Sequence, residues 1–154
     1  MGDPTTTLRD LTTEERHALA CVLDAIIPPS ADGRMPGAGA VGIATHVEGV
    51  LRTLPDLHAM VVEGLRDLDT QARAQHDRGF ADLGEAERAA LVAMQGFSYA
   101  LVPHAYVGYY QQDRVLEAIG MEPRPPHPEG YALPPNDLSL LDPVKARGAR
   151  YRDC

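Results

Sequence analysis

The sequence contains no tryptophan and only two phenylalanines, although 44% of its 154 residues are hydrophobic. Alanine, leucine, valine and isoleucine must therefore fill the interior, and this mixture suits helices better than sheets. A chain of this length has the usual size of one domain and buries roughly two thirds of its unfolded surface. We expect an all-α protein with one self-standing core.

Positive charge is also scarce, because 14 basic residues face 22 acidic ones and leave a formal net charge of −8. Nucleic acids are bound by neutralising their phosphates with Lys and Arg, and anionic lipid surfaces attract the same residues. The composition therefore disfavours DNA, RNA and anionic membranes as partners. Lys145 is the only lysine. The other cations are arginines, which suit bidentate carboxylate contacts at interfaces.

Cysteine is scarce as well, with two residues, and long apolar runs are missing. Cys21 and Cys154 lie near opposite ends of the chain, whereas a secreted disulfide scaffold needs more cysteines in a shorter sequence, so we interpret both as thiols. No apolar run approaches the ~20 residues of a membrane span. Residues 1–10 carry neither a basic start nor an apolar stretch. We therefore expect no signal peptide in this chain and a cytoplasmic location.

The hydrophobic pattern predicts a small bundle of about five helices within residues 11–120, after a flexible N-terminus at residues 1–10. Thr12 and Glu15 have the spacing of a capping box, and Pro28 and Pro29 end the helix that follows. Further helices are predicted at about residues 40–52, 55–76 and 113–119. Another is predicted to begin near Glu85 and to be interrupted or kinked at Pro103.

From Met121 onward the composition changes, because seven of the 13 prolines lie between Pro123 and Pro143. Proline removes a backbone donor and disfavours the helical conformation of the preceding residue, so residues 121–154 are either disordered or an extended arm. Spaced tyrosines and leucines argue against disorder, since disordered tails are depleted in them. We expect an extended Pro-rich arm that wraps a partner subunit.

Two motifs resemble binding sites without the required context. Residues 37–42, GAGAVG, satisfy the G-x-G-x-x-G dinucleotide pattern, but no strand precedes them, so we interpret them as a loop. His17 and Cys21 stand at i and i+4 on one helix, yet no second pair completes a metal site. No serine or cysteine occupies a nucleophile motif. We expect no catalytic, cofactor-binding or metal-binding residues in this chain.

Tyrosines gather at one place, with Tyr99, Tyr106, Tyr109 and Tyr110 close in the sequence. Tyrosine is favoured at interfaces because it offers a rigid apolar ring with a polar tip, although core packing uses it equally well. The crowding beside the arm favours an interface. The predicted partner-interface residues are Tyr106, Tyr109, Tyr110, His127, Tyr131, Leu133, Leu138, Leu140, Leu141 and Tyr151.

Three segments together resemble a known family: LTTEERHALACVLDAIIP, GLRDLDTQARAQHDRGFADLGEAERAALVAM and FSYALVPHAYVGYYQQDRVLEAIG. The combination of a helix ending in AIIP, then LDxxAR, FADL and YY…IG, is similar to the gluconate 2-dehydrogenase subunit 3 family. The resemblance covers roughly residues 8 to 131. Single pieces of this pattern carry little information, and the combination carries the resemblance.

The resemblance implies a helical, non-catalytic small subunit that assembles with a large FAD-dependent oxidoreductase of the glucose-methanol-choline (GMC) type. In such complexes the flavin belongs to the large subunit, which acts on sugars, sugar acids or glycosides. Many members carry a twin-arginine export signal, whereas residues 8–10 here offer one arginine and no apolar segment. A periplasmic location would then need a signal on the partner. The alternative is an independent helical module that binds a small ligand or another protein.

Overall fold

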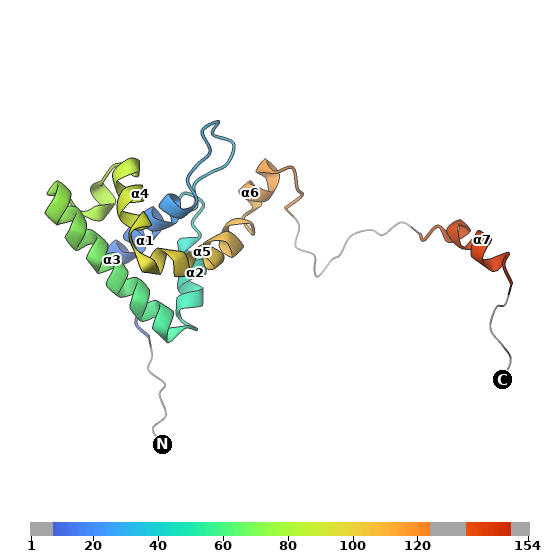
Figure 1. Cartoon of the computed structure of the whole chain (residues 1–154), viewed down its shortest axis with the longest axis horizontal. Coiled ribbons are helices and arrows are strands. Elements are labelled where there is room, and N and C mark those ends of the chain that lie inside the picture. Colours follow the sequence, from blue (N-terminus) through green and yellow to red (C-terminus); the bar gives the residue numbers. More distant parts are fainter. Residues whose placement is uncertain (1–7, 124–134, 149–154) are drawn as a thin grey trace, which may run out of the picture. The chain divides into compact units, whose positions relative to one another are not determined.

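The computed structural model describes residues 8–123 and 135–148. All regular structure in these two ranges is helical and neither contains a strand, which confirms the all-α prediction (Figure 1). The chain forms two compact units, Met1–Pro123 and Arg124–Cys154. No helix in the described residues is both long and apolar enough to cross a bilayer.

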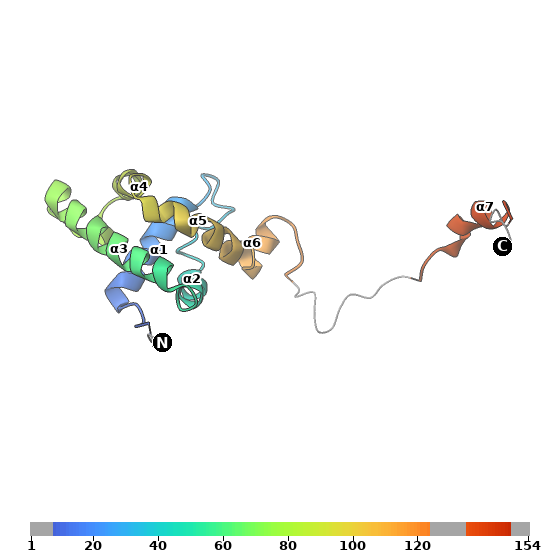
Figure 2. The ribbon, with the colours of Figure 1, turned by 60° about the horizontal axis from the view of Figure 1, so that its bottom comes forward.

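The described part of the first unit contains six α-helices and one short 3-10 helix. They are α1 (Thr13–Ile26), α2 (Ala44–Leu51), α3 (Pro55–His76), η1 (Phe80–Asp82), α4 (Glu85–Ala93), α5 (Gly96–Tyr109) and α6 (Asp113–Ala118). Helix α1 contacts α2, α3, η1, α4 and α5, so these five elements gather around it (Figures 1 and 2). Its buried face, Leu19 to Leu23, therefore lies at the centre of the core.

Helices α1 and α3 form as the sequence predicts because their end signals are local. The Thr12 hydroxyl accepts from Glu15 N at 3.2 Å, and the Glu15 carboxylate accepts from Thr12 N at 3.0 Å, which completes the capping box. Pro55 stands in the first turn of α3, where its missing N–H costs nothing. Asp77 ends α3 in a left-handed conformation with φ of 53°.

Two helix boundaries differ from the prediction. The second helix begins at Ala44 rather than near residue 40, because Gly42 has a φ of +76° that a helix cannot contain. The predicted helix from Glu85 breaks at Gln95, whose backbone is extended, and Pro103 lies inside α5. The proline is tolerated because it is exposed, so water can hydrate the carbonyl group that lacks its N–H partner.

The described part of the second unit contains two short helical elements, η2 (Leu138–Leu141) and α7 (Asp142–Lys145). The sequence analysis did not predict them. The Asp137 carboxylate accepts from Ser139 N at 3.0 Å and caps η2, while Pro143 occupies a first-turn position that a helix accepts. No residue of these two elements is buried.

Candidate partner-binding surface

Helix α5 contains no Asp, Glu, Lys or Arg in its 14 residues. Its inner face is buried against the bundle and includes Phe97, Leu101, Ala105 and Tyr109. A surface helix of a globular domain normally carries charged residues on its outer face, whereas a helix that is apolar all round is buried on all sides. The composition of α5 is therefore typical of a helix whose outer side is buried as well as its inner side.

The outer side of α5 carries apolar and aromatic side chains at helical spacing. Relative exposures are 69% for Tyr99, 44% for Tyr106, 52% for Val107 and 46% for Tyr110, and Pro103 is exposed between them. The rings of Tyr106 and Tyr110 stack with centroids 6.1 Å apart. We call these five residues the tyrosine face. A charge-free, tyrosine-rich patch of this kind has the composition of the core of a protein interface.

Close contacts fix α5 in the bundle and so hold the tyrosine face in place. Near the start of α5 the Phe97 ring packs directly on Gly64 of α3. Near its end, Gly108 packs on the His46 side chain of α2. A face on a rigid helix loses little conformational entropy when a partner binds it.

The structure places the predicted interface residue Tyr109 in the core instead, with only 1% of its surface exposed. Its hydroxyl donates to the backbone carbonyl of Pro36 at 2.7 Å, and burial raises the pKa of the phenol. The position was misread because α5 is apolar on both faces, so the sequence did not distinguish inside from outside. Tyr106 and Tyr110 remain available to a partner.

In the second unit, the predicted residues Leu138, Leu140 and Leu141 are between 47% and 77% exposed. Val144, which the sequence analysis did not select, is 57% exposed and follows Leu140 at helical spacing. The same spacing rule would have found both Val144 and Val107 of the tyrosine face. The other predicted interface residues lie outside the described ranges; these are His127, Tyr131, Leu133 and Tyr151.

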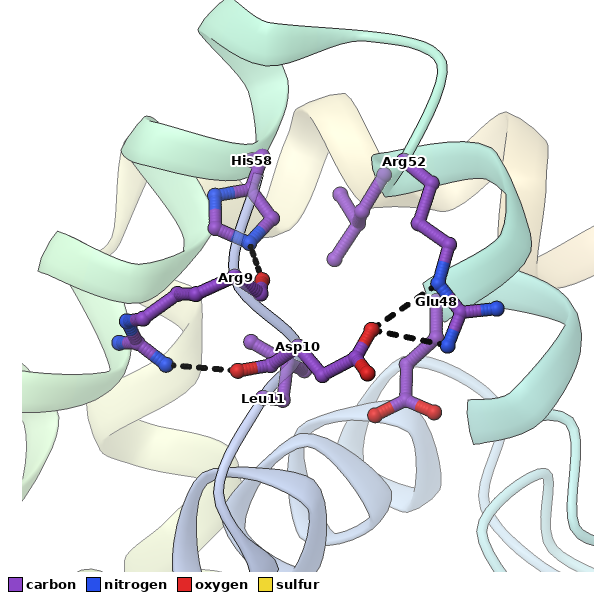
Figure 3. Close-up of a pocket in the computed structure, with 7 residues that line it drawn as sticks. Arg9, Asp10, Leu11, Glu48, Arg52 and His58 are labelled. Carbon is purple, nitrogen blue, oxygen red and sulfur yellow. Dashed lines mark hydrogen bonds and ion pairs between the residues drawn. The ribbon is translucent and has the colours of Figure 1, made fainter. Parts of the chain in front are cut away.

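A small cavity lies where the N-terminal segment crosses α2 and α3 (Figure 3). His58 Nε2 donates to the Arg9 carbonyl at 2.9 Å, and Arg52 donates two hydrogen bonds to one Asp10 carboxylate oxygen, at 2.9 and 3.1 Å. Glu48, which lines the same cavity, is paired with Arg16 at 2.8 Å. The volume is about 10 Å³, room for one water molecule at most. The polar groups here tie the N-terminal segment to the bundle.

The glycine pattern at residues 37–42 is a loop that packs closely on α1. The backbone N–H of Gly39 donates to the Asp24 carboxylate at 2.8 Å. A Cβ atom at Gly37 would meet the same carboxylate, and one at Gly39 would meet the Ala20 carbonyl. Close backbone approach to a helix therefore accounts for both glycines, with no strand before them.

Side chains that could hold a metal do not cluster in the described residues, where no group of three or more His, Cys, Asp or Glu is found. Cys21 is buried, and its Sγ accepts from Arg88 Nη1 at 3.0 Å. The thiol therefore accepts a hydrogen bond from a residue of α4.

Residues 13–98 match the family model described as gluconate 2-dehydrogenase subunit 3, which is more than half of the chain. The chain belongs to the gluconate 2-dehydrogenase subunit 3 family. No curated protein and no solved structure matches it. The matched range runs from the start of α1 to the first turn of α5 and ends just before the tyrosine face.

In this member of the gluconate 2-dehydrogenase subunit 3 family, the LDxxAR and FADL segments hold η1 against α3. The Asp69 carboxylate accepts from Phe80 N at 3.1 Å and from Arg73 Nε at 2.8 Å, and the Arg73 hydrogen bond lowers the pKa of Asp69. Phe80 is thereby seated in the core. Two of the segments that carry the resemblance, LDxxAR and FADL, are therefore hydrogen-bonded to each other and hold part of the core in place.

Proposed function

We propose that this chain is the non-catalytic small subunit of a dehydrogenase complex and that the tyrosine face of α5 binds the large subunit. The tyrosine face carries the proposal, because it is a charge-free surface on a rigid helix of a chain with net charge −8. Membership of a family named for a dehydrogenase subunit supports it. A surface of Tyr, Val and Pro gains free energy when it leaves water, at about 25 cal/mol per Å² of apolar area.

The proposed partner is a large FAD-dependent oxidoreductase of the GMC type that acts on sugars, sugar acids or glycosides. The flavin and the catalytic groups belong to that subunit, and the small subunit stabilises it. This partner is inferred from the family resemblance. We propose a cytoplasmic complex, or a periplasmic one if the large subunit carries an export signal.

The arm at residues 121–154 is proposed to contact the same partner. Within η2 and α7, four large apolar side chains are exposed, and eight helical residues are too few to be stable in water alone. Short amphipathic helices of this kind commonly bind by laying their apolar side chains in a groove of another protein.

The proposal is tested by co-expressing the chain with an FAD-dependent GMC-type dehydrogenase of the same organism and purifying the complex through a tag on the small subunit. The double variant Tyr106→Asp, Val107→Asp places two charges on the tyrosine face and is expected to abolish co-purification of the dehydrogenase. Leu54→Asp is the matched control. Leu54 has a similar exposure of 42% but stands at the N-cap of α3, where Asp is a favoured residue.

Retention of the large subunit by the wild type and by Leu54→Asp, with its loss from the double variant, supports the proposal. Circular dichroism of the isolated variants checks that the helices have formed. A wild-type chain that is a stable monomer and retains no dehydrogenase would contradict the proposal. It would favour the alternative, an independent helical binding module.

A further inference from the structure

A second surface feature lies on the first unit, apart from the residues of the tyrosine face. It is a cleft of about 660 Å³ formed by the end of α1, the loop that follows it, α4 and Arg114 of α6. In both views the loop between α1 and α2 lies between α4 and α6 (Figures 1 and 2). Most of the walls are apolar and come from Ala25, Pro28, Pro29, Met35, Pro36 and Ala89.

Two arginines in the cleft have no carboxylate partner in the described residues. Arg88 is half-buried, and within the described ranges its side chain makes one hydrogen bond, to the Cys21 sulfur, so most of its five side-chain N–H donors find no acceptor there. Arg114 is exposed at the same cleft and makes no ion pair within the described ranges. Six other arginines of the first unit do pair with carboxylates within 4 Å.

The acidic residues of the cleft limit the charge of a suitable ligand. Asp24 lines the cleft, but one of its oxygens accepts from Gly39 N. Glu85 also lines it, at the first turn of α4, where a carboxylate complements the helix dipole. The two positive and two negative side chains leave the cleft without a net positive charge, so it does not favour a polyanion. A single carboxylate placed beside the half-buried Arg88 is favoured, because a guanidinium can hold it with two parallel hydrogen bonds.

We propose that this cleft binds a chain segment of the partner subunit in which an Asp or Glu side chain is flanked by apolar residues. The inference rests on the proposed function, since it names the chemistry of a second contact with the same partner. The carboxylate pairs with Arg88 and Arg114, and the flanking side chains pack on the proline, methionine and alanine walls. A sugar fits less well, because these apolar walls offer few hydrogen-bonding groups to its hydroxyls.

Two neighbouring alanines of α4 give a matched steric test. Ala89 and Ala90 are both exposed, but only Ala89 lines the cleft. Ala89→Trp is expected to fill the cleft and to weaken binding of the purified dehydrogenase by tenfold or more, as measured by biolayer interferometry. Ala90→Trp adds the same ring outside the cleft and is expected to leave the Kd within about twofold of the wild-type value, as is usual for surface substitutions.

A second pair of variants tests the charge. Arg88→Gln combined with Arg114→Gln is expected to weaken binding by about tenfold or more, since each charge-assisted hydrogen bond is worth about that factor. The loss should shrink as the salt concentration rises. Arg52→Gln, which removes an arginine paired with Asp10 away from the cleft, is the control.

The outcomes separate this inference from the proposed function. If the wild type binds the dehydrogenase and the Ala89→Trp and double glutamine variants bind equally well, the cleft is not a contact site and the inference is overturned. If the wild type itself does not bind the dehydrogenase, the proposed function fails first. Loss of binding in Ala89→Trp but not in Ala90→Trp, together with the salt-dependent loss in the double variant, supports the inference.

Discussion

The hydroxyl of Tyr109 donates a 2.7 Å hydrogen bond to the backbone carbonyl of Pro36, 73 residues earlier in the chain. Both atoms of this bond are buried. The bond ties the end of α5 to the loop that follows α1. The same loop forms one wall of the cleft, so one tyrosine links the helix that carries the tyrosine face to the wall of the second candidate contact site.

Tyr109→Phe should lower the free energy of unfolding by about 1 to 3 kcal/mol, because the Pro36 carbonyl would stay buried without a donor. Urea denaturation followed by circular dichroism measures the change. Tyr110→Phe is the control and should change stability by less than about 0.5 kcal/mol, because the Tyr110 side chain is partly exposed. Equal effects of the two substitutions would contradict the role given to the Tyr109 hydroxyl.

Alanine at two helical glycines should change stability in opposite directions. At Gly64 the new methyl group would meet the buried Phe97 ring, and overpacking of this kind costs about 1 to 3 kcal/mol. At Gly49 of α2 the methyl group would meet open space, so the higher helix propensity of alanine should add about 0.5 to 1 kcal/mol.

Thermal unfolding of Gly64→Ala and Gly49→Ala, followed at the same pH and salt concentration, compares the two variants. Both carry the same substitution in the same kind of element, so the difference isolates the contact with Phe97. A higher Tm for both variants would show that α5 can shift away from α3 without cost.

Glu15 should contribute to stability above pH 4.5 and lose that contribution in acid. The Arg9 guanidinium donates to both of its carboxylate oxygens at 2.6 Å and lowers the pKa of Glu15 to about 2. A carboxyl group whose pKa is lowered by folding stabilises the protein above its unfolded pKa, and this is lost as the pH falls towards 2. Because Arg9 is 44% exposed, we expect a contribution of about 1 to 2 kcal/mol after solvent screening.

Glu15→Gln tests this pH dependence, because glutamine keeps the capping interaction with Thr12 but cannot form the ion pair. The variant should be less stable than the wild type at pH 7, and the difference should largely vanish near pH 2. Comparing the two proteins at each pH removes the effect of the other carboxyl groups. A difference that is the same at both pH values would contradict the assignment.

Removing residues 121–154 should abolish co-purification with the dehydrogenase while residues 8–120 stay folded. The described helices α1 to α6 contain a complete set of buried core residues of their own, so the Tm of the truncated chain should lie within a few degrees of the full-length value. Leu140→Asp combined with Leu141→Asp in the full chain should have the same effect on binding. Full assembly and activity without the arm would disprove its proposed role.

The sequence by itself determined the elements whose signals are local. The Thr12 and Glu15 capping box, the proline at residue 55 and the glycine that ends the last helix of the bundle act within a few residues, so α1, α3 and α6 could be predicted. The all-α class followed from the composition, which has few of the aromatic residues that favour strands.

The tertiary structure alone decided which side of α5 faces the core. Helical spacing identifies the buried face only when the opposite face is polar, and α5 is apolar all round, so Tyr109 and Tyr106 were indistinguishable. The cleft could not be predicted either, because two of the residues that line it, Cys21 and Arg88, are 67 positions apart in the sequence. Contacts between distant residues depend on how the helices pack, and no local preference of the chain encodes them.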